Sequence, residues 1–314
     1  MSAAGAESGP GLREALAVWL MWGVVAAMVF VTYFRLPARD FYNVTGSGVT
    51  GGSARVLILV GWPISLAAVA LIWLATDRLL GRPIERRHRR TLVGTALAAT
   101  VFCATIAWPG VITQSDLDAK PSNALAAVGV TVAVALTVVA VRRRGLGPHA
   151  IRGRGDRLAL GLAAAFALAA LPWIFANAGI YVGDVPGLGG VFMSKKILPE
   201  PGHPDLHAVH LGNHEGLDGW LLAFTALVLR PTIGQMRPTR LRPVLGAYLA
   251  LMFCYGVMVA ANDGWHEQIV KRGWTSHGLP NVITPGLSFG WAVLLVASAV
   301  VYRIGYRVPT ADSA

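Results

Sequence analysis

The sequence predicts an all-α, polytopic integral membrane protein, built as a bundle of about eight transmembrane helices. Two features of composition lead to this class. The 314 residues are 54% hydrophobic and only 14% charged, whereas soluble domains carry roughly 25% charged residues. The mean hydropathy is +0.55, and several apolar runs approach the length of about 20 residues that crosses a bilayer. These figures exclude a soluble enzyme, a disordered tail and a secreted disulfide scaffold.

Eight apolar runs divide the chain, which we expect to form a single transmembrane domain over residues 1–314. In lipid each run must be helical, because an unpaired backbone amide is costly there. The first run is too long for the apolar part of a signal peptide, so we expect a retained helix. The runs cover residues 15–34, 56–74, 92–108, 124–141, 158–176, 220–233, 244–261 and 287–302.

The basic residues predict the orientation of these helices. Of the 27 Lys and Arg residues, 19 fall on one side, mainly in the loops 78–91, 142–157 and 230–242. Because such residues collect in cytoplasmic loops, both termini are expected in the cytoplasm and the chain in the plasma membrane. The Arg-rich loops should lie against anionic lipid head groups. The net charge of +11 comes without a nucleic-acid-binding motif, so we expect no nucleic-acid partner. The excess of Arg over Lys is typical of GC-rich bacterial genomes.

Histidines gather in the predicted extracytoplasmic loop 177–218. Four of the eight in the chain lie between residues 203 and 214. His207, His210, His214 and Asp218 follow one another at intervals of three, four and four, which places side chains on one face of a helix. Such a helix could continue into the sixth run. Because glycine disfavours helix, a break near Gly212 with the chain folded back is the alternative.

A second polar cluster, containing Asp263, His266 and Glu267, follows the seventh run directly. The sixth and seventh runs are joined by a short loop and should pack antiparallel, which makes their outer ends neighbours. Imidazole and carboxylate ligands suit a divalent metal such as Zn. Glu215 and Glu267 are candidate general bases for a metal-bound water. The candidate metal ligands are His207, His210, His214, Asp218, Asp263 and His266.

Other interpretations of these residues remain open. The histidines could be simply solvated or hydrogen-bonded, or could form a pH-sensing cluster, because imidazole titrates near pH 6.5. The adjacent histidine pairs of the histidine-box desaturases are absent from the sequence, and the chain is identified with no family. The Gly-rich segment 43–53 has neither the preceding strand nor the lysine of a phosphate-binding loop, so we expect a flexible connector there.

The sequence favours an integral-membrane enzyme that acts on a lipid or lipid-linked substrate at the extracytoplasmic face, and that depends on a metal if the candidate ligands bind one. A transporter or permease is the alternative, although no ionisable residue lies near the middle of any run, which argues against an ion-coupled carrier. An accessory membrane protein without catalysis, with partners that the sequence does not name, is the third interpretation.

Overall fold

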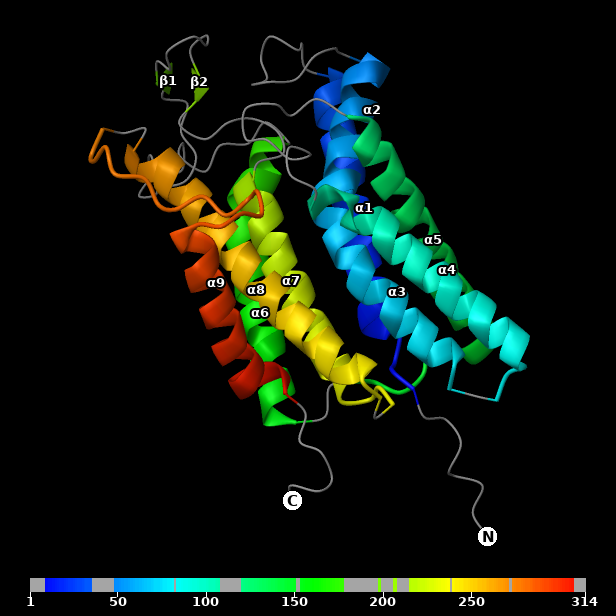
Figure 1. Cartoon of the computed structure of the whole chain (residues 1–314). Coiled ribbons are helices and arrows are strands. Elements are labelled where there is room, and N and C mark those ends of the chain that lie inside the picture. Colours follow the sequence, from blue (N-terminus) through cyan, green and yellow to red (C-terminus); the bar gives the residue numbers. More distant parts are fainter. Residues whose placement is uncertain are drawn as a thin grey trace.

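The computed structural model describes residues 9–35, 48–81, 83–107, 120–150, 153–177, 197–198, 206–207, 215–237, 239–270 and 273–307. Within them the fold is a bundle of long helices with one short two-stranded ribbon (Figure 1). The helices are α1 (Arg13–Arg35), α2 (Gly48–Leu59), α3 (Ser65–Leu79), α4 (Arg86–Ala104), α5 (Pro121–Arg144), α6 (Arg154–Asn177), α7 (Glu215–Ile233), α8 (Leu241–Trp265) and α9 (Phe289–Val301).

Shorter helical turns extend or join these helices. The π-helix η2 (Val60–Ile64) joins α2 to α3 without a break, the 3-10 turn η3 (Thr105–Ala107) ends α4, and the π-helices η5 (His266–Val270) and η6 (Tyr302–Tyr306) extend α8 and α9. Strands β1 (Ile197–Leu198) and β2 (Leu206–His207) pair antiparallel.

The apolar runs form helices, as the sequence predicts. Among the described residues, six helical segments are long and apolar enough to cross a membrane, so the chain is compatible with a helical, multi-pass membrane protein. They are Arg13–Arg35, Gly48–Leu79, Arg86–Ala107, Pro121–Arg144, Leu241–Trp265 and Phe289–Tyr306. Helices α6 and α7 pack against each other, and α7 packs along α8.

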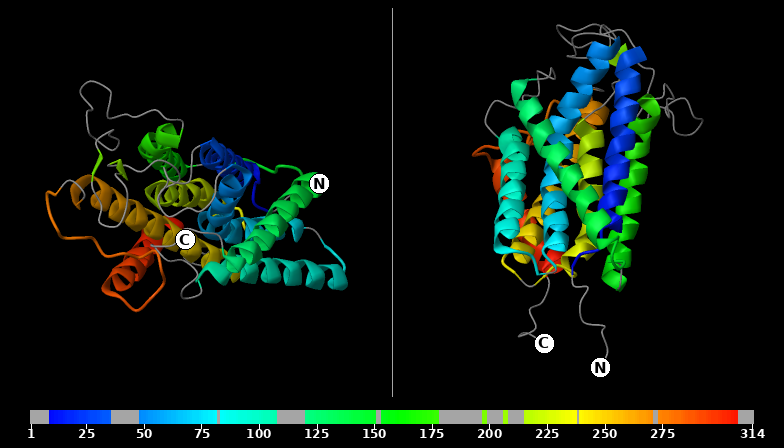
Figure 2. Two further views of the ribbon diagram at one scale, coloured as in Figure 1. Left: turned by 90° about the horizontal axis from the view of Figure 1, so that it is seen from above. Right: turned by 90° about the vertical axis from the view of Figure 1, so that its right-hand side faces the viewer.

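The helices form two groups, α1–α5 and α6–α9, that lie side by side (Figures 1 and 2). Seen from above, the cross-section is elongated, with α4 and α5 toward one side and α8 and α9 toward the other (Figure 2). We call the end at which α1 begins and α7 finishes the basal end. The end at which α7 begins and α8 finishes is the apical end.

Helices α7 and α8 approach each other closely at two glycines. A Cβ atom added to Gly219 would lie 2.6 Å from the amide nitrogen of Ala260, and one added to Gly256 would lie 2.5 Å from the carbonyl oxygen of Gly219. Small residues of this kind let helix backbones approach each other, which is a common device in membrane bundles. The prediction that these helices pack antiparallel with neighbouring apical ends is confirmed.

The Gly-rich segment differs from the expected flexible connector, because residues 48–53 form the first turns of α2. The reason is again close packing. A Cβ atom added to Gly52 would lie 2.9 Å from the carbonyl oxygen and the ring of Phe30 on α1. The glycines that lower the helical propensity of this segment therefore let it pack against α1, and this packing outweighs the propensity.

A buried ion pair joins the two helix groups at the basal end. Asp77, in the last turn of α3, is completely buried and lies 2.9 Å from a guanidinium nitrogen of Arg237, between α7 and α8. Arg237 also donates to Asp77 through Nε at 2.9 Å, and to the carbonyl oxygen of Leu80 at 2.9 Å. Since Arg237 is only partly exposed, at 26% of its side chain, this pair is shielded from most of the screening that weakens surface ion pairs.

The segment 9–12 lies buried beneath the basal end and packs on the turn that follows α5. The amide of Gly11 donates to the Gln235 side chain at 2.6 Å, and the amide of Leu12 donates to the carbonyl oxygen of Leu146 at 2.8 Å. The guanidinium of Arg78 donates to the carbonyl oxygen of Gly9 at 3.5 Å and to that of Arg144, at the end of α5, at 2.7 Å. Backbone at the start of the chain is thus fixed by groups from three distant elements.

Candidate functional site: an aromatic pocket near the apical end

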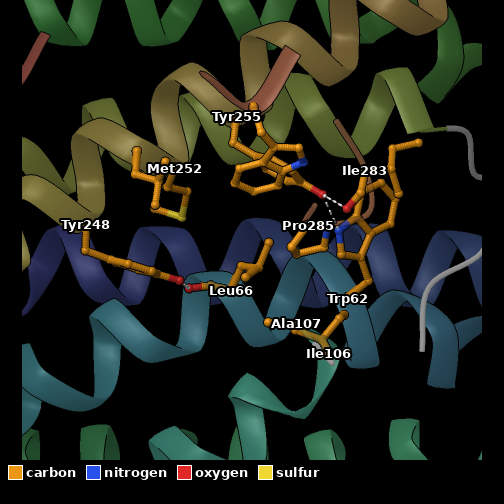
Figure 3. A pocket seen from close by; sticks show the side chains of 11 residues that line it. Trp62, Leu66, Ile106, Ala107, Tyr248, Met252, Tyr255, Ile283 and Pro285 are labelled. Atoms are coloured by element: carbon orange, nitrogen blue, oxygen red, sulfur yellow. Dashed lines mark hydrogen bonds between the residues drawn. The ribbon is translucent and has the colours of Figure 1, made fainter. Parts of the chain in front are cut away.

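An apolar pocket of about 200 Å³ lies between the two helix groups, toward their apical end (Figure 3). One wall comes from η2 and α3, another from η3, and the remainder from α8, the segment before α9 and α9 itself. The pocket is partly open to the surroundings of the protein. The eleven lining residues are all apolar or aromatic: Trp62, Leu66, Ile106, Ala107, Tyr248, Leu251, Met252, Tyr255, Ile283, Pro285 and Trp291.

The hydroxyl of Tyr255 joins three elements at the upper part of this pocket. It accepts a hydrogen bond from Trp62 Nε1 of η2 at 3.0 Å and donates one to the carbonyl oxygen of Ile283 at 3.0 Å (Figure 3). All three residues are buried. Tyr255 therefore holds both helix groups and the segment before α9 in one arrangement.

The other two aromatic side chains of the pocket, Tyr248 and Trp291, also form hydrogen bonds with protein groups. The hydroxyl of Tyr248 donates to the carbonyl oxygen of Leu66 at 2.6 Å, and Trp291 Nε1 donates to the carbonyl oxygen of Thr284 at 2.8 Å. The walls consequently offer ring faces and aliphatic groups to a ligand. A cavity of this chemistry stays dry and accepts hydrocarbon; one of roughly 150 Å³ holds benzene.

Two tyrosines mark the extent of the pocket wall that α8 contributes. Tyr248 and Tyr255 lie seven residues apart on one face of α8, which corresponds to about 10 Å along the helix axis. The pocket is therefore longer than a benzene ring and suits a segment of an extended hydrocarbon chain.

The segment 277–288 contributes Ile283 and Pro285 to the pocket wall and is fixed by side chains of α8 and α9. Asn262 Nδ2 donates to the carbonyl oxygen of Leu279 at 2.8 Å, and Trp265 Nε1 donates to that of His277 at 2.7 Å. Val282 and Ile283 are buried in the core. With Tyr255 and Trp291, four side chains thus hold the backbone of this segment, and its position is determined by the helices that frame the pocket.

Two of the predicted ligands, Asp218 and Asp263, lie buried near the neighbouring apical ends of α7 and α8, with exposures of 2% and 4%. Glu215, in the first turn of α7, is half-buried. Glu215 and Asp218 lie within electrostatic range of the Tyr255 hydroxyl. Glu215 and Asp218 therefore lie in the same part of the bundle as the Tyr255 hydroxyl.

The structure describes only part of the predicted metal site. His210 and His214 lie outside the described residues, as do the side chains of His207 and Glu267. His266 is exposed at the start of η5, whereas Asp263, three residues earlier, is buried. Among the residues that the structure describes, no group of three or more His, Cys, Asp or Glu side chains could hold a metal ion.

Of the two alternatives for the histidine segment, the continuous helix does not extend to His207. His207 lies in strand β2, opposite Ile197, so the helical stripe that the spacing favoured does not reach back to it. Extended backbone turns successive side chains to opposite sides, and the helical offsets from His207 to the later residues no longer apply. α7 begins at Glu215 in the described residues.

The sequence interpretation missed the aromatic pocket. It gave the tyrosines of α8 no role. Tyr248 and Tyr255 share one face of α8, and this signal was available in the sequence. The position of Trp62 could not be predicted from the sequence, because it depends on how η2 packs against α8. Trp62 and Tyr255 are 193 residues apart in the chain.

Comparisons of the chain with protein-family models, curated proteins and solved structures find no match.

Proposed function

We propose that this protein binds a lipid or lipid-linked molecule, with the hydrocarbon part in the aromatic pocket and the polar part toward the apical end. The observation that carries the proposal is the chemistry of the pocket: its four aromatic side chains all direct their polar atoms to protein partners. Hydrocarbon gains about 25 cal/mol for each Å² of apolar surface that it buries, and polar ligands gain nothing from such walls.

We further propose that α1, α2–α3, α4, α5, α6, α7, α8 and α9 give eight membrane crossings in the plasma membrane, with both termini cytoplasmic. The basal end then faces the cytoplasm, and its Arg-rich loops lie against anionic head groups. Two exposed positions test this orientation, Glu85 and Ser276. Ser276→Cys should react with a membrane-impermeant maleimide in intact cells, and Glu85→Cys only after permeabilisation. The reverse labelling pattern would show that the apical end faces the cytoplasm and would contradict the proposed orientation.

A matched pair of variants tests the pocket. Ala107 lines the pocket and is exposed, so Ala107→Trp should fill its mouth without disturbing the core. Ala104 is exposed on α4 one turn earlier and lies outside the lining, so Ala104→Trp is the control. A lipid with a photoreactive acyl chain should label peptides containing Tyr248 and Trp291 in the wild type and in the control. Equal labelling in Ala107→Trp would contradict the proposal.

The activity that we propose for this site is that of an enzyme whose chemistry takes place at the apical end, next to Asp218 and Asp263. A divalent metal such as Zn, held by residues of the two polar clusters, would supply the activated water. The test is metal content in the purified protein by mass spectrometry. Alanine at His207, His210 and His214 together should lower it, and metal content that is absent or unchanged would remove the metal from the proposal. Lipid-stimulated solute flux in proteoliposomes that survives these substitutions would favour a transporter.

A further inference from the structure

A second apolar site lies on the other side of the π-helix η2 from the aromatic pocket. It is a groove of about 320 Å³ between α1, η2 and α5. Val60 and Ile64 of η2 line the groove, whereas Trp62 of the same π-helix lines the aromatic pocket. The remaining lining residues are Leu16, Trp19, Trp22, Gly23, Ala26, Val130, Val134, Thr137 and Val138.

The polar atoms in this groove are also used within the protein. Trp19 Nε1 donates to the Thr137 hydroxyl at 3.1 Å, and that hydroxyl donates to the carbonyl oxygen of Ala133 at 2.9 Å. Trp22 Nε1 donates to the Thr225 hydroxyl on α7 at 3.1 Å. The groove therefore presents hydrocarbon and indole faces, and its lining contains no charged side chain.

The groove continues into the exposed apolar surface of the same two helices. Leu20 and Val24 on α1 are 70% and 59% exposed, and Val134 and Val138 on α5 are each 40% exposed. Both helices are among the segments long and apolar enough to cross a membrane. A surface of this kind faces lipid in a membrane protein, so the medium around the groove is itself hydrocarbon.

We propose that this groove binds an acyl chain of a bilayer lipid. The chain enters from the surrounding lipid and packs between Trp19 and Val134, against the side of η2 that faces away from the aromatic pocket. The site is separate from the one under the proposed function, and its occupant is a structural lipid instead of a substrate. A chain packed on Val60 and Ile64 supports the π-helical turn that carries Trp62.

Gly23 allows the groove to be filled without disturbing the fold. It is exposed on α1, and a Cβ atom added there meets no other atom within 4 Å. Gly23→Leu therefore projects a side chain into the groove, and it should also strengthen the helix, since glycine costs about 1 kcal/mol in a helix interior. Gly161 on α6 is equally exposed and open, and Gly161→Leu is a matched control outside the groove.

The experiment uses the full chain in nanodiscs that contain phosphatidylcholine with a photoreactive group on one acyl chain. We expect peptides containing Trp19 and Val134 to be labelled severalfold more than those containing Val101 and Leu168, which are 65% and 64% exposed on α4 and α6. Gly23→Leu should abolish the excess, and Gly161→Leu should keep it. Labelling near Tyr248 in the aromatic pocket should be the same in both variants.

Three outcomes would overturn the proposal. Labelling of the groove at the level of Val101 and Leu168 would mean an ordinary lipid-facing surface, and an excess that persists in Gly23→Leu would place the lipid elsewhere. Crosslinks from α1 or α5 to a second copy of the chain would make the groove a protein interface. Because Ala107→Trp tests the aromatic pocket and Gly23→Leu tests the groove, failure of one site is distinguishable from failure of the other.

Discussion

Replacement of Tyr255 by Phe tests whether one hydroxyl holds the two helix groups together. The change removes a donor and an acceptor at once, and leaves Trp62 Nε1 and the Ile283 carbonyl oxygen without the partner that each has at 3.0 Å. A buried group left unsatisfied costs about 1–3 kcal/mol. Side-chain hydrogen bonds in a membrane protein average nearer 0.6 kcal/mol, with a maximum of about 1.7. Two bonds in a pocket partly open to its surroundings place the expected loss at about 1–3 kcal/mol.

Two other tyrosines provide a graded comparison for this loss. Tyr248→Phe removes one hydrogen bond, to a carbonyl oxygen of α3, and should cost less than Tyr255→Phe. Tyr302, in η6, has no hydroxyl bond among the described residues and gives the baseline for loss of the oxygen alone. The measurement is the free energy of unfolding in bicelles, by denaturant titration with tryptophan fluorescence. If Tyr255→Phe and Tyr302→Phe are equally stable, the bridge does not hold the groups, and the reasoning is wrong.

Two further predictions concern helix packing. Asp77→Asn should destabilise the protein by about 3–5 kcal/mol, because it leaves the partly buried Arg237 without its carboxylate. Adding Arg237→Gln should recover part of this loss, measured by the same denaturant titration. A double variant that is no more stable than Asp77→Asn would show that the two residues are not coupled. Gly219→Val should separate α7 from α8 and lower the yield of folded protein in size-exclusion chromatography. Gly264→Val, at an open position on α8, should leave the yield unchanged. Similar yields for the two variants would refute the argument that α7 and α8 need a close contact at Gly219.

The sequence predicted the helices well because hydrocarbon imposes helix on any long apolar run. The apolar runs predicted the central parts of the helices. In the structure the helices also include polar residues at their ends, such as Glu215 at the start of α7. Prediction failed where packing decides conformation. Residues 48–53 carry three glycines, which favour a loop locally, and their contact with Phe30 makes them helical.

The candidate site could be predicted only in part, for two physical reasons. The packing of α7 against α8 was predicted correctly, because a short connection makes consecutive helices antiparallel neighbours. The sequence left a continuous helix through His207 open as one of two alternatives, because spacing alone cannot exclude an extended strand. The aromatic pocket was missed because Trp62 and Tyr255 meet through the register of distant helices, which a single sequence does not encode in any local pattern.

The burial of residues 9–12 has a consequence for how the protein is made. The amide of Gly11 donates to the Gln235 side chain, 224 residues later in the chain, so this contact can form only after α7 has been synthesised. Until then the segment 9–12 lacks this contact, and its docking therefore follows the synthesis of α1 to α7. A polypeptide released before Gln235 would leave this segment exposed to proteases and quality-control factors.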